Sequence, residues 1–176
     1  AALAMARRGL DALVLLTRDD LARSPEACAW RLRALVDSHN PARAVGEVTC
    51  ALPAINARGA AERRPFVVAA VQAALDLARS NVALDWLRAL PDGDPVANLW
   101  RGRAYLALEQ RDLARLRFGR AALAGDPTVK AAAKLGLIEV EIPSSGGIPA
   151  RATAALDDFL FAWRGGAAEE RGLRRS

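Results

Sequence analysis

The chain offers few side chains from which a catalytic or metal-binding site could be built. Its single histidine, His39, stands where a helix is expected to end, and a cation there would stabilise the helix dipole. One histidine and two cysteines cannot supply the four ligands of an ordinary structural zinc site, although a site made of carboxylates stays open. The acidic pairs Asp157-Asp158 and Glu169-Glu170 point to different helix faces, so we interpret them as solvated charges. We therefore expect no catalytic residue, no metal and no cofactor.

Motifs for phosphate binding and for hydrolysis are absent from the sequence. Neither Gly-x-Gly-x-x-Gly nor Gly-x-x-x-x-Gly-Lys-Ser/Thr occurs, and Gly146-Gly147 lies in an insertion without the strand that a phosphate loop needs. No Gly-x-Ser-x-Gly elbow is present. An enzyme would have to assemble its site from scattered carboxylates and arginines, so we expect a non-enzymatic protein.

The two cysteines, Cys28 and Cys50, are too few for a disulfide framework. Free cysteine is commonly a small buried hydrophobe, so we expect two buried thiols. A single disulfide stays open as the alternative, because both residues fall on helices expected to be adjacent.

The charge is basic, with 25 basic and 20 acidic residues and 23 of the basic ones arginine. An arginine-rich, lysine-poor composition is typical of GC-rich genomes, and the charges are scattered along the chain. One cluster stands out, and we expect it to be a solvated face: Arg111, Arg115, Arg117 and Arg120. The alternative is a helical-repeat module that binds nucleic acid or another polyanion through helix 111–120. Only Phe118 could stack on bases there, and we assign it to the core.

The composition and the positions of proline and glycine predict an all-α fold. Of 176 residues, 40 are alanine and 25 leucine, both strong helix formers, and 52% are apolar. Proline and glycine divide the chain into short helical lengths. The expected helices cover residues 3–16, 25–40, 41–56, 61–79, 81–90, 96–110, 113–124, 127–141 and 150–163, with a further one beginning near 167. No apolar run reaches the length of a membrane span, and no signal peptide is expected, because Asp11 interrupts the one weak candidate.

An internal repeat follows these helices. The pattern is an alanine at position i, an apolar residue at i+4 and a small or apolar residue at i+7, which all share one helix face. It occurs four times, at Ala44-Val48-Ala51, Ala83-Leu87-Leu90, Ala114-Phe118-Ala121 and Ala155-Phe159-Ala162. The starts are 39, 31 and 41 residues apart, and the last spacing becomes 34 without the seven-residue insertion at 143–149. Gly102 and Gly136 also stand 34 residues apart.

The glycine within helix 96–110 predicts close packing. Glycine inside a helix costs about 1 kcal/mol relative to alanine, so Gly102 indicates a place where two backbones approach closely. We expect Phe118 to plug the space between Ala114 and Ala121 there.

Residues 99–105, followed by Ala114, Phe118, Ala121 and Asp126-Pro127, resemble the tetratricopeptide repeat. The resemblance covers about residues 94–164; Arg101 departs from it by occupying a leucine position. It implies a right-handed α-solenoid of stacked antiparallel helix pairs. We expect one helical-repeat domain over 1–176, with an N-terminal helix in 1–20, helix pairs at 25–58, 60–93, 94–126 and 127–164, a flexible insertion at 143–149 and a further helix starting in 167–176.

The same resemblance implies a concave groove lined by the first helix of each pair, which suits protein–protein interaction or scaffolding. The groove places fall on Leu99, Arg103, Leu106, Lys130, Leu137 and Val140. An apolar strip with cations suits a peptide or partner helix that carries hydrophobic anchors and acidic groups. The alternative is that Leu99 and Leu106 are ordinary core.

Residues 156–175 also resemble a segment of large uncharacterised repeat proteins of alphaproteobacteria. This resemblance implies a bacterial source and a longer parent chain, and no activity. The sequence does not decide between a cytoplasmic and a periplasmic location, nor the oligomeric state.

Overall fold

The protein is helical throughout the part of the chain that the computed structural model describes, residues 9–18, 21, 23–142 and 149–159. All regular secondary structure in these residues is α-helix. The expected all-α class is confirmed. Most of the insertion at 143–149, the end of the predicted helix 150–163 and the predicted start of a helix near 167 lie outside the described residues.

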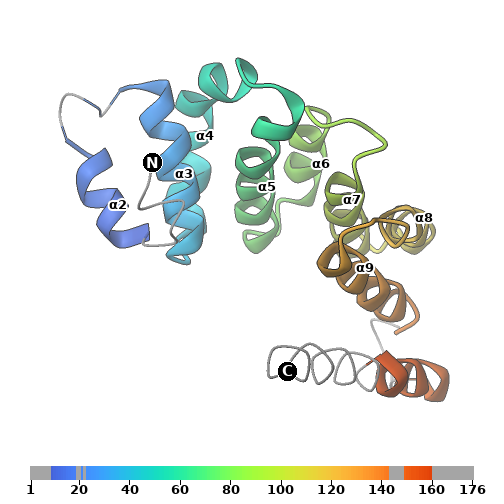
Figure 1. Cartoon of the computed structure of the whole chain (residues 1–176). Helices are drawn as coiled ribbons and strands as arrows, with labels where there is room; N and C mark the ends of the chain where they lie inside the picture. Colours follow the sequence, from blue (N-terminus) through green and yellow to red (C-terminus); the bar gives the residue numbers. More distant parts are fainter. Residues whose placement is uncertain (1–8, 19–20, 22, 143–148, 160–176) are drawn as a thin grey trace, which may run out of the picture.

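Eight helices have defined bounds: α2 Gly9–Leu16, α3 Pro25–Asp37, α4 Pro41–Asn56, α5 Ala60–Asp76, α6 Ser80–Leu87, α7 Pro95–Ala107, α8 Arg111–Ala121 and α9 Pro127–Val140 (Figure 1). Residues 150–159 are also helical. Four of these helices begin at a proline, because proline fits the first helical position. Three of these starts are as predicted, and α7 begins one residue before the expected start at Val96. Asp94 and Asp126 cap α7 and α9 by accepting hydrogen bonds from the backbone N–H groups of the first turn.

Three helices, α3, α5 and α7, end in the same left-handed turn. His39, Ala78 and Glu109 have φ values of 54°, 57° and 59°. The N–H groups of each and of the next residue donate to carbonyls of the preceding helix, which is a Schellman motif. The following helix starts within two residues, and five residues after each left-handed residue comes a fully buried alanine: Ala44, Ala83 and Ala114. The spacing found in the sequence therefore corresponds to a repeated turn.

This turn explains two differences from the expected elements. The helix expected over 25–40 stops at Asp37, because the backbone turns left-handed at His39. His39 is exposed and serves as the turn residue, beyond the helix end that it was expected to stabilise by charge.

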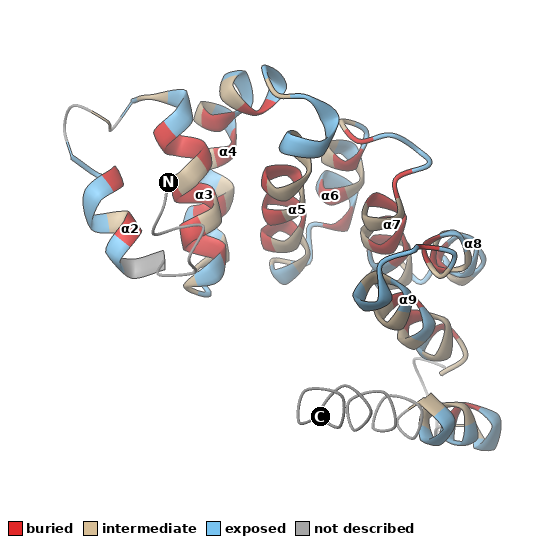
Figure 2. Ribbon diagram, viewed as in Figure 1, coloured by how far each residue is buried: buried red, intermediate tan, exposed pale blue. Residues whose placement is uncertain are grey.

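The helices follow one another along an arc (Figure 1). Each contacts the next in the chain, from α2 to α9, and α3, α5, α7 and α9 also contact one another in that order. Buried residues lie where these helices face each other (Figure 2). One large apolar cluster runs from α3 to the start of α7, and a second one joins α7, α8 and α9.

Phe118 is the centre of the second cluster. Its side chain is fully buried, as are Ala114 and Ala121, so its predicted place in the core is confirmed. A Cβ atom added at Gly102 or at Gly136 would lie 2.6 Å from the Phe118 ring. The close approach predicted at Gly102 therefore exists, but the neighbour is an aromatic ring and not a second backbone.

Candidate functional site

The six residues predicted to line a groove divide into core and surface. Leu99 and Val140 are buried in the cluster around Phe118, with exposed fractions of 7% and 2%. Leu106 and Leu137 are half-buried against the same cluster, whereas Arg103 and Lys130 are exposed. Leu99 and Val140 were predicted to line a groove, but both belong to the core. For Leu99 this is the alternative that the sequence left open. The reason is that α7 and α9 pack against each other and against α8, so their apolar residues must face more than one neighbour.

We call the other four predicted residues, together with Trp100, the α7–α9 surface. It consists of Trp100, Arg103 and Leu106 on α7 and of Lys130 and Leu137 on α9. The Arg103 guanidinium lies over the Trp100 ring, 4.7 Å from its centroid. Trp100 is half-buried beneath this exposed cation, and Leu106 is half-buried as well. Lys130 and Leu137 belong to α9, which contacts α7.

The arginines of α8 mostly bind other parts of the chain. Arg111 donates to the carbonyls of Val140 (2.6 Å) and Ile142 (2.7 Å), at the end of α9. Cationic donors at a helix carboxyl end satisfy carbonyls that lack helical partners. Arg115 forms an ion pair with Glu141 at 2.7 Å, and its hydrogen bond lowers the pKa of that carboxyl group.

Arg117 points to the other neighbour of α8. Its Nη1 donates to the Asn98 side-chain oxygen at 3.2 Å and lies 3.6 Å from an Asp92 oxygen. Arg111, Arg115 and Arg117 therefore join α8 to α7 and α9. The expectation of a solvated arginine face is wrong for Arg111 and Arg117, which are half-buried, whereas 49% of the Arg115 side chain is exposed. Arg120 is exposed. Polyanion binding by residues 111–120 would have to compete with these internal partners.

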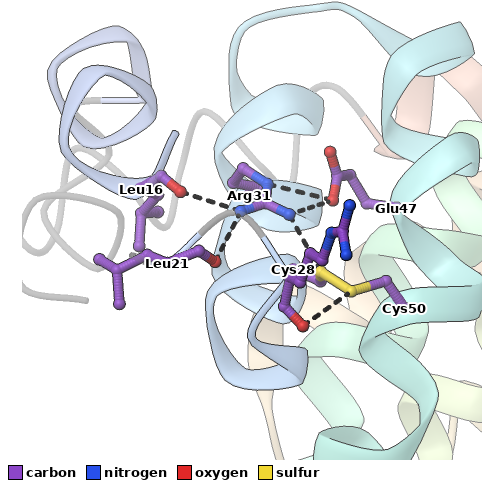
Figure 3. The surroundings of a disulfide bond; sticks show 7 residues. Leu16, Leu21, Cys28, Arg31, Glu47 and Cys50 are labelled. Atoms are coloured by element: carbon purple, nitrogen blue, oxygen red, sulfur yellow. Dashed lines mark hydrogen bonds and ion pairs between the residues drawn. A yellow bond between two sulfur atoms is a disulfide. The ribbon is translucent and has the colours of Figure 1, made fainter. Parts of the chain in front are cut away.

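Cys28 and Cys50 form a disulfide that joins α3 to α4, with Cα atoms 5.8 Å apart (Figure 3). The expectation of two buried thiols is wrong, and the alternative of a single bridge holds. Cys28 is completely buried. The bridge lies in the larger apolar cluster, so it reinforces the packing of α3 on α4.

Arg31 lies beside the bridge and contacts three segments (Figure 3). It forms an ion pair with Glu47 of α4 at 2.8 Å and donates to the Leu16 carbonyl of α2 at 2.9 Å. Its Nη2 also lies 3.0 Å from the Cys28 sulfur. Only 7% of this side chain is exposed. Sequence reasoning missed Arg31, because an arginine within an amphipathic helix carries no local signal that it will be buried.

A second buried arginine, Arg101, lies at the turn between α6 and α7. Its Nη2 donates to the carbonyls of Leu87 (2.9 Å) and Leu90 (3.0 Å), and its Nη1 lies 3.3 Å from an Asp92 oxygen. Burial lowers the pKa of Arg101, Arg117 lowers it further, and Asp92 acts in the opposite direction. The sequence did contain a signal here, since Arg101 occupies the place where the tetratricopeptide pattern has leucine.

Arg101 also lines a surface hollow of about 530 Å³. Its polar lining consists of Arg88, Asp92, Arg101, Tyr105 and Arg117, and two leucines complete it. The charged groups come from α7, α8 and the loops after α6, which are separated in sequence.

Two further findings concern metals and membranes. The described part of the chain contains no group of three or more histidine, cysteine, aspartate or glutamate side chains placed to hold a metal ion. None of the described helices combines the length and the apolar character that crossing a bilayer requires.

Comparison of the chain with protein-family models, with curated proteins and with solved structures finds no match.

Proposed function

We propose that this chain is a non-enzymatic helical-repeat module, built as a tetratricopeptide-like solenoid of helix pairs, that binds a partner protein. The left-handed turn repeated at His39, Ala78 and Glu109 supports the repeat. The ordered contacts of α3, α5, α7 and α9 are those that a stack of helix pairs makes along one side. The repeat is also supported by Phe118, whose ring packs against two glycines, Gly102 and Gly136, that stand 34 residues apart.

The observation that carries the binding function is the α7–α9 surface. A guanidinium stacked on an indole is held in place while it remains open to a partner. Tryptophan and arginine are enriched among residues that dominate protein interfaces. The half-buried Leu106 and Leu137 add apolar area, and Lys130 adds a second cation. A helix or extended peptide with hydrophobic anchors and an acidic side chain fits this combination.

Site-specific photo-crosslinking tests the proposal. A photoreactive amino acid at Ala107, an exposed position of α7, is expected to trap a partner in cells, whereas the same group at Thr49 on α4 is not. Arg103→Glu should abolish the crosslink from position 107, because it reverses the charge that faces the acidic group of the partner.

Arg43→Glu is the matched control, since Arg43 is an exposed arginine on α4. Both variants are expected to keep the melting temperature of the parent chain, because neither side chain is part of the core. An unchanged crosslink with Arg103→Glu, or an equal loss with Arg43→Glu, would contradict the assigned surface.

A fluorescence titration with single-stranded and duplex oligonucleotides at two salt concentrations tests the polyanion alternative. Binding through phosphates falls steeply as salt rises. We expect no such binding through helix 111–120, because Arg111 and Arg115 already donate to groups at the end of α9.

A further inference from the structure

The hollow beside Arg101 brings together two guanidinium groups that share one carboxylate. Arg101 belongs to α7 and Arg117 to α8, and Asp92 belongs to the loop between α6 and α7. One Asp92 oxygen lies 3.3 Å from Arg101 Nη1 and 3.6 Å from Arg117 Nη1. Two positive charges therefore face a single negative charge at this place.

Arg101 is held rigidly, and its charge cannot leave the site. Only 8% of its side chain is exposed, and carbonyls of Leu87 and Leu90 fix its Nη2. Its burial also lowers the pKa of Arg101, and the nearby Arg117 acts in the same direction, whereas Asp92 favours the charged form. Arginine nevertheless remains charged in proteins. An additional anion would therefore be stabilised here.

Arg117 has unused hydrogen-bonding capacity. Its Nη1 donates to the neutral amide oxygen of Asn98, and its Nε is buried without an acceptor among the described residues. A buried donor that lacks a partner is unfavourable, so the neighbours of Arg117 compensate its guanidinium only in part. The Tyr105 side chain also lines the hollow.

Asp92 is far more exposed than either Arg101 or Arg117. About 79% of its side chain is accessible, so water already competes for its contacts with the two arginines. A ligand anion that binds with two oxygens would replace these contacts with a paired, charge-assisted geometry.

We propose that this hollow is a binding site for an oxyanion, a carboxylate or phosphate group of a larger ligand, held between Arg101 and Arg117. Asp92 occupies the site when the ligand is absent and acts as an internal competitor. The volume of about 530 Å³ exceeds that of a single inorganic ion, which suits an anionic group attached to a larger molecule. The site lies between α6, α7 and α8 and does not depend on the α7–α9 surface.

Calorimetric titration at low salt with pyrophosphate and with succinate tests the proposal. Arg117→Gln is expected to weaken binding at least tenfold, because it removes one of the two charged donors. Asp92→Asn is expected to tighten binding about fivefold to tenfold, because it removes the competing carboxylate. Tighter binding of pyrophosphate would assign a phosphate ligand, and tighter binding of succinate a carboxylate ligand; either result supports the site.

Arg120→Gln is the matched control. Arg120 is an exposed arginine on the same helix, outside this hollow, and its removal should leave the affinity within about twofold. Thermal melts identify any variant that fails to fold, and a charge-preserving Arg117→Lys should then retain part of the binding. The proposal is overturned if neither probe binds, if Arg117→Gln and Arg120→Gln weaken binding equally, or if folded Asp92→Asn binds no more tightly than the parent.

Discussion

The region around α3 and α4 and the region around α7, α8 and α9 use the same turn and the same buried alanine, yet they are stabilised differently. The first is crosslinked by Cys28–Cys50 and tied by the buried ion pair of Arg31 with Glu47. The second has no disulfide among its described residues, and it packs around Phe118. One repeated backbone plan can thus be stabilised by a covalent bond or by a single well-packed aromatic ring.

The glycines sharpen this contrast. Gly46 in α4 and Gly119 in α8 have open space where a Cβ atom would be added. Gly102 and Gly136 face the Phe118 ring at 2.6 Å and have no such space. A helical glycine therefore marks close packing at Gly102 and Gly136, on the two helices that flank Phe118, and not at Gly46 or Gly119.

The largest effect is expected from Phe118→Ala. Removing a fully buried phenylalanine costs about 3–5 kcal/mol of unfolding free energy. Thermal or denaturant unfolding measures the loss, and hydrogen exchange should show that protection falls in α7–α9 before it falls in α3–α4. A melting temperature lowered by less than about two degrees would contradict the role of Phe118 as the centre of this region.

Reducing the disulfide is expected to have the next largest effect, in the first region. The bridge closes a segment with a sequence separation of 22 residues, and crosslinks of this size contribute about 2–4 kcal/mol. Denaturant unfolding with and without reductant measures the difference. The variant Cys50→Ala should unfold identically in both conditions, and a parent chain indifferent to reductant would show that the bridge does not stabilise α3 on α4.

Gly102→Ala and Gly136→Ala should each destabilise the second region by about 1–3 kcal/mol, because the new methyl group would collide with a buried ring. Gly46→Ala and Gly119→Ala are the matched controls. With open space around them they should instead gain up to about 1 kcal/mol from the higher helix propensity of alanine. Equal effects at all four positions in chemical denaturation would remove the distinction between the two kinds of glycine.

The smallest expected effect concerns the turn that both regions share. Ala78→Gly should stabilise the chain by about 1 kcal/mol, because a left-handed φ is strained for alanine and free for glycine. Glu109→Gly should do the same at the turn before α8. Ala57, an exposed residue with a right-handed backbone, is the control, and Ala57→Gly should give no gain in a denaturant melt. Destabilisation by Ala78→Gly would show that the turn is not strained.

Local chemistry explains why the helices and their buried residues could be predicted. Proline at a first helical position and an aspartate cap act over three or four residues, so they are visible in the sequence around Pro95 and Pro127. Alanine and phenylalanine at a helical period mark a buried face in the same way, and this was sufficient to place Phe118 in the core.

The chemistry of the arginines depends on partners that are distant in sequence. Arg31, Arg101 and Arg117 look like surface residues of amphipathic helices, yet each reaches an acceptor from another segment. The tetratricopeptide resemblance places Leu99 and Val140 on a groove, but a sequence pattern does not show which neighbouring helix covers a residue.

The sequence by itself therefore determined the helical class, the approximate positions of the helices and the repeated small residues, because propensity, capping and periodicity are local. Only the tertiary structure decided which arginines are buried, whether Cys28 and Cys50 are joined, and which groups remain open to a ligand. These depend on distances between segments that the chain brings together when it folds.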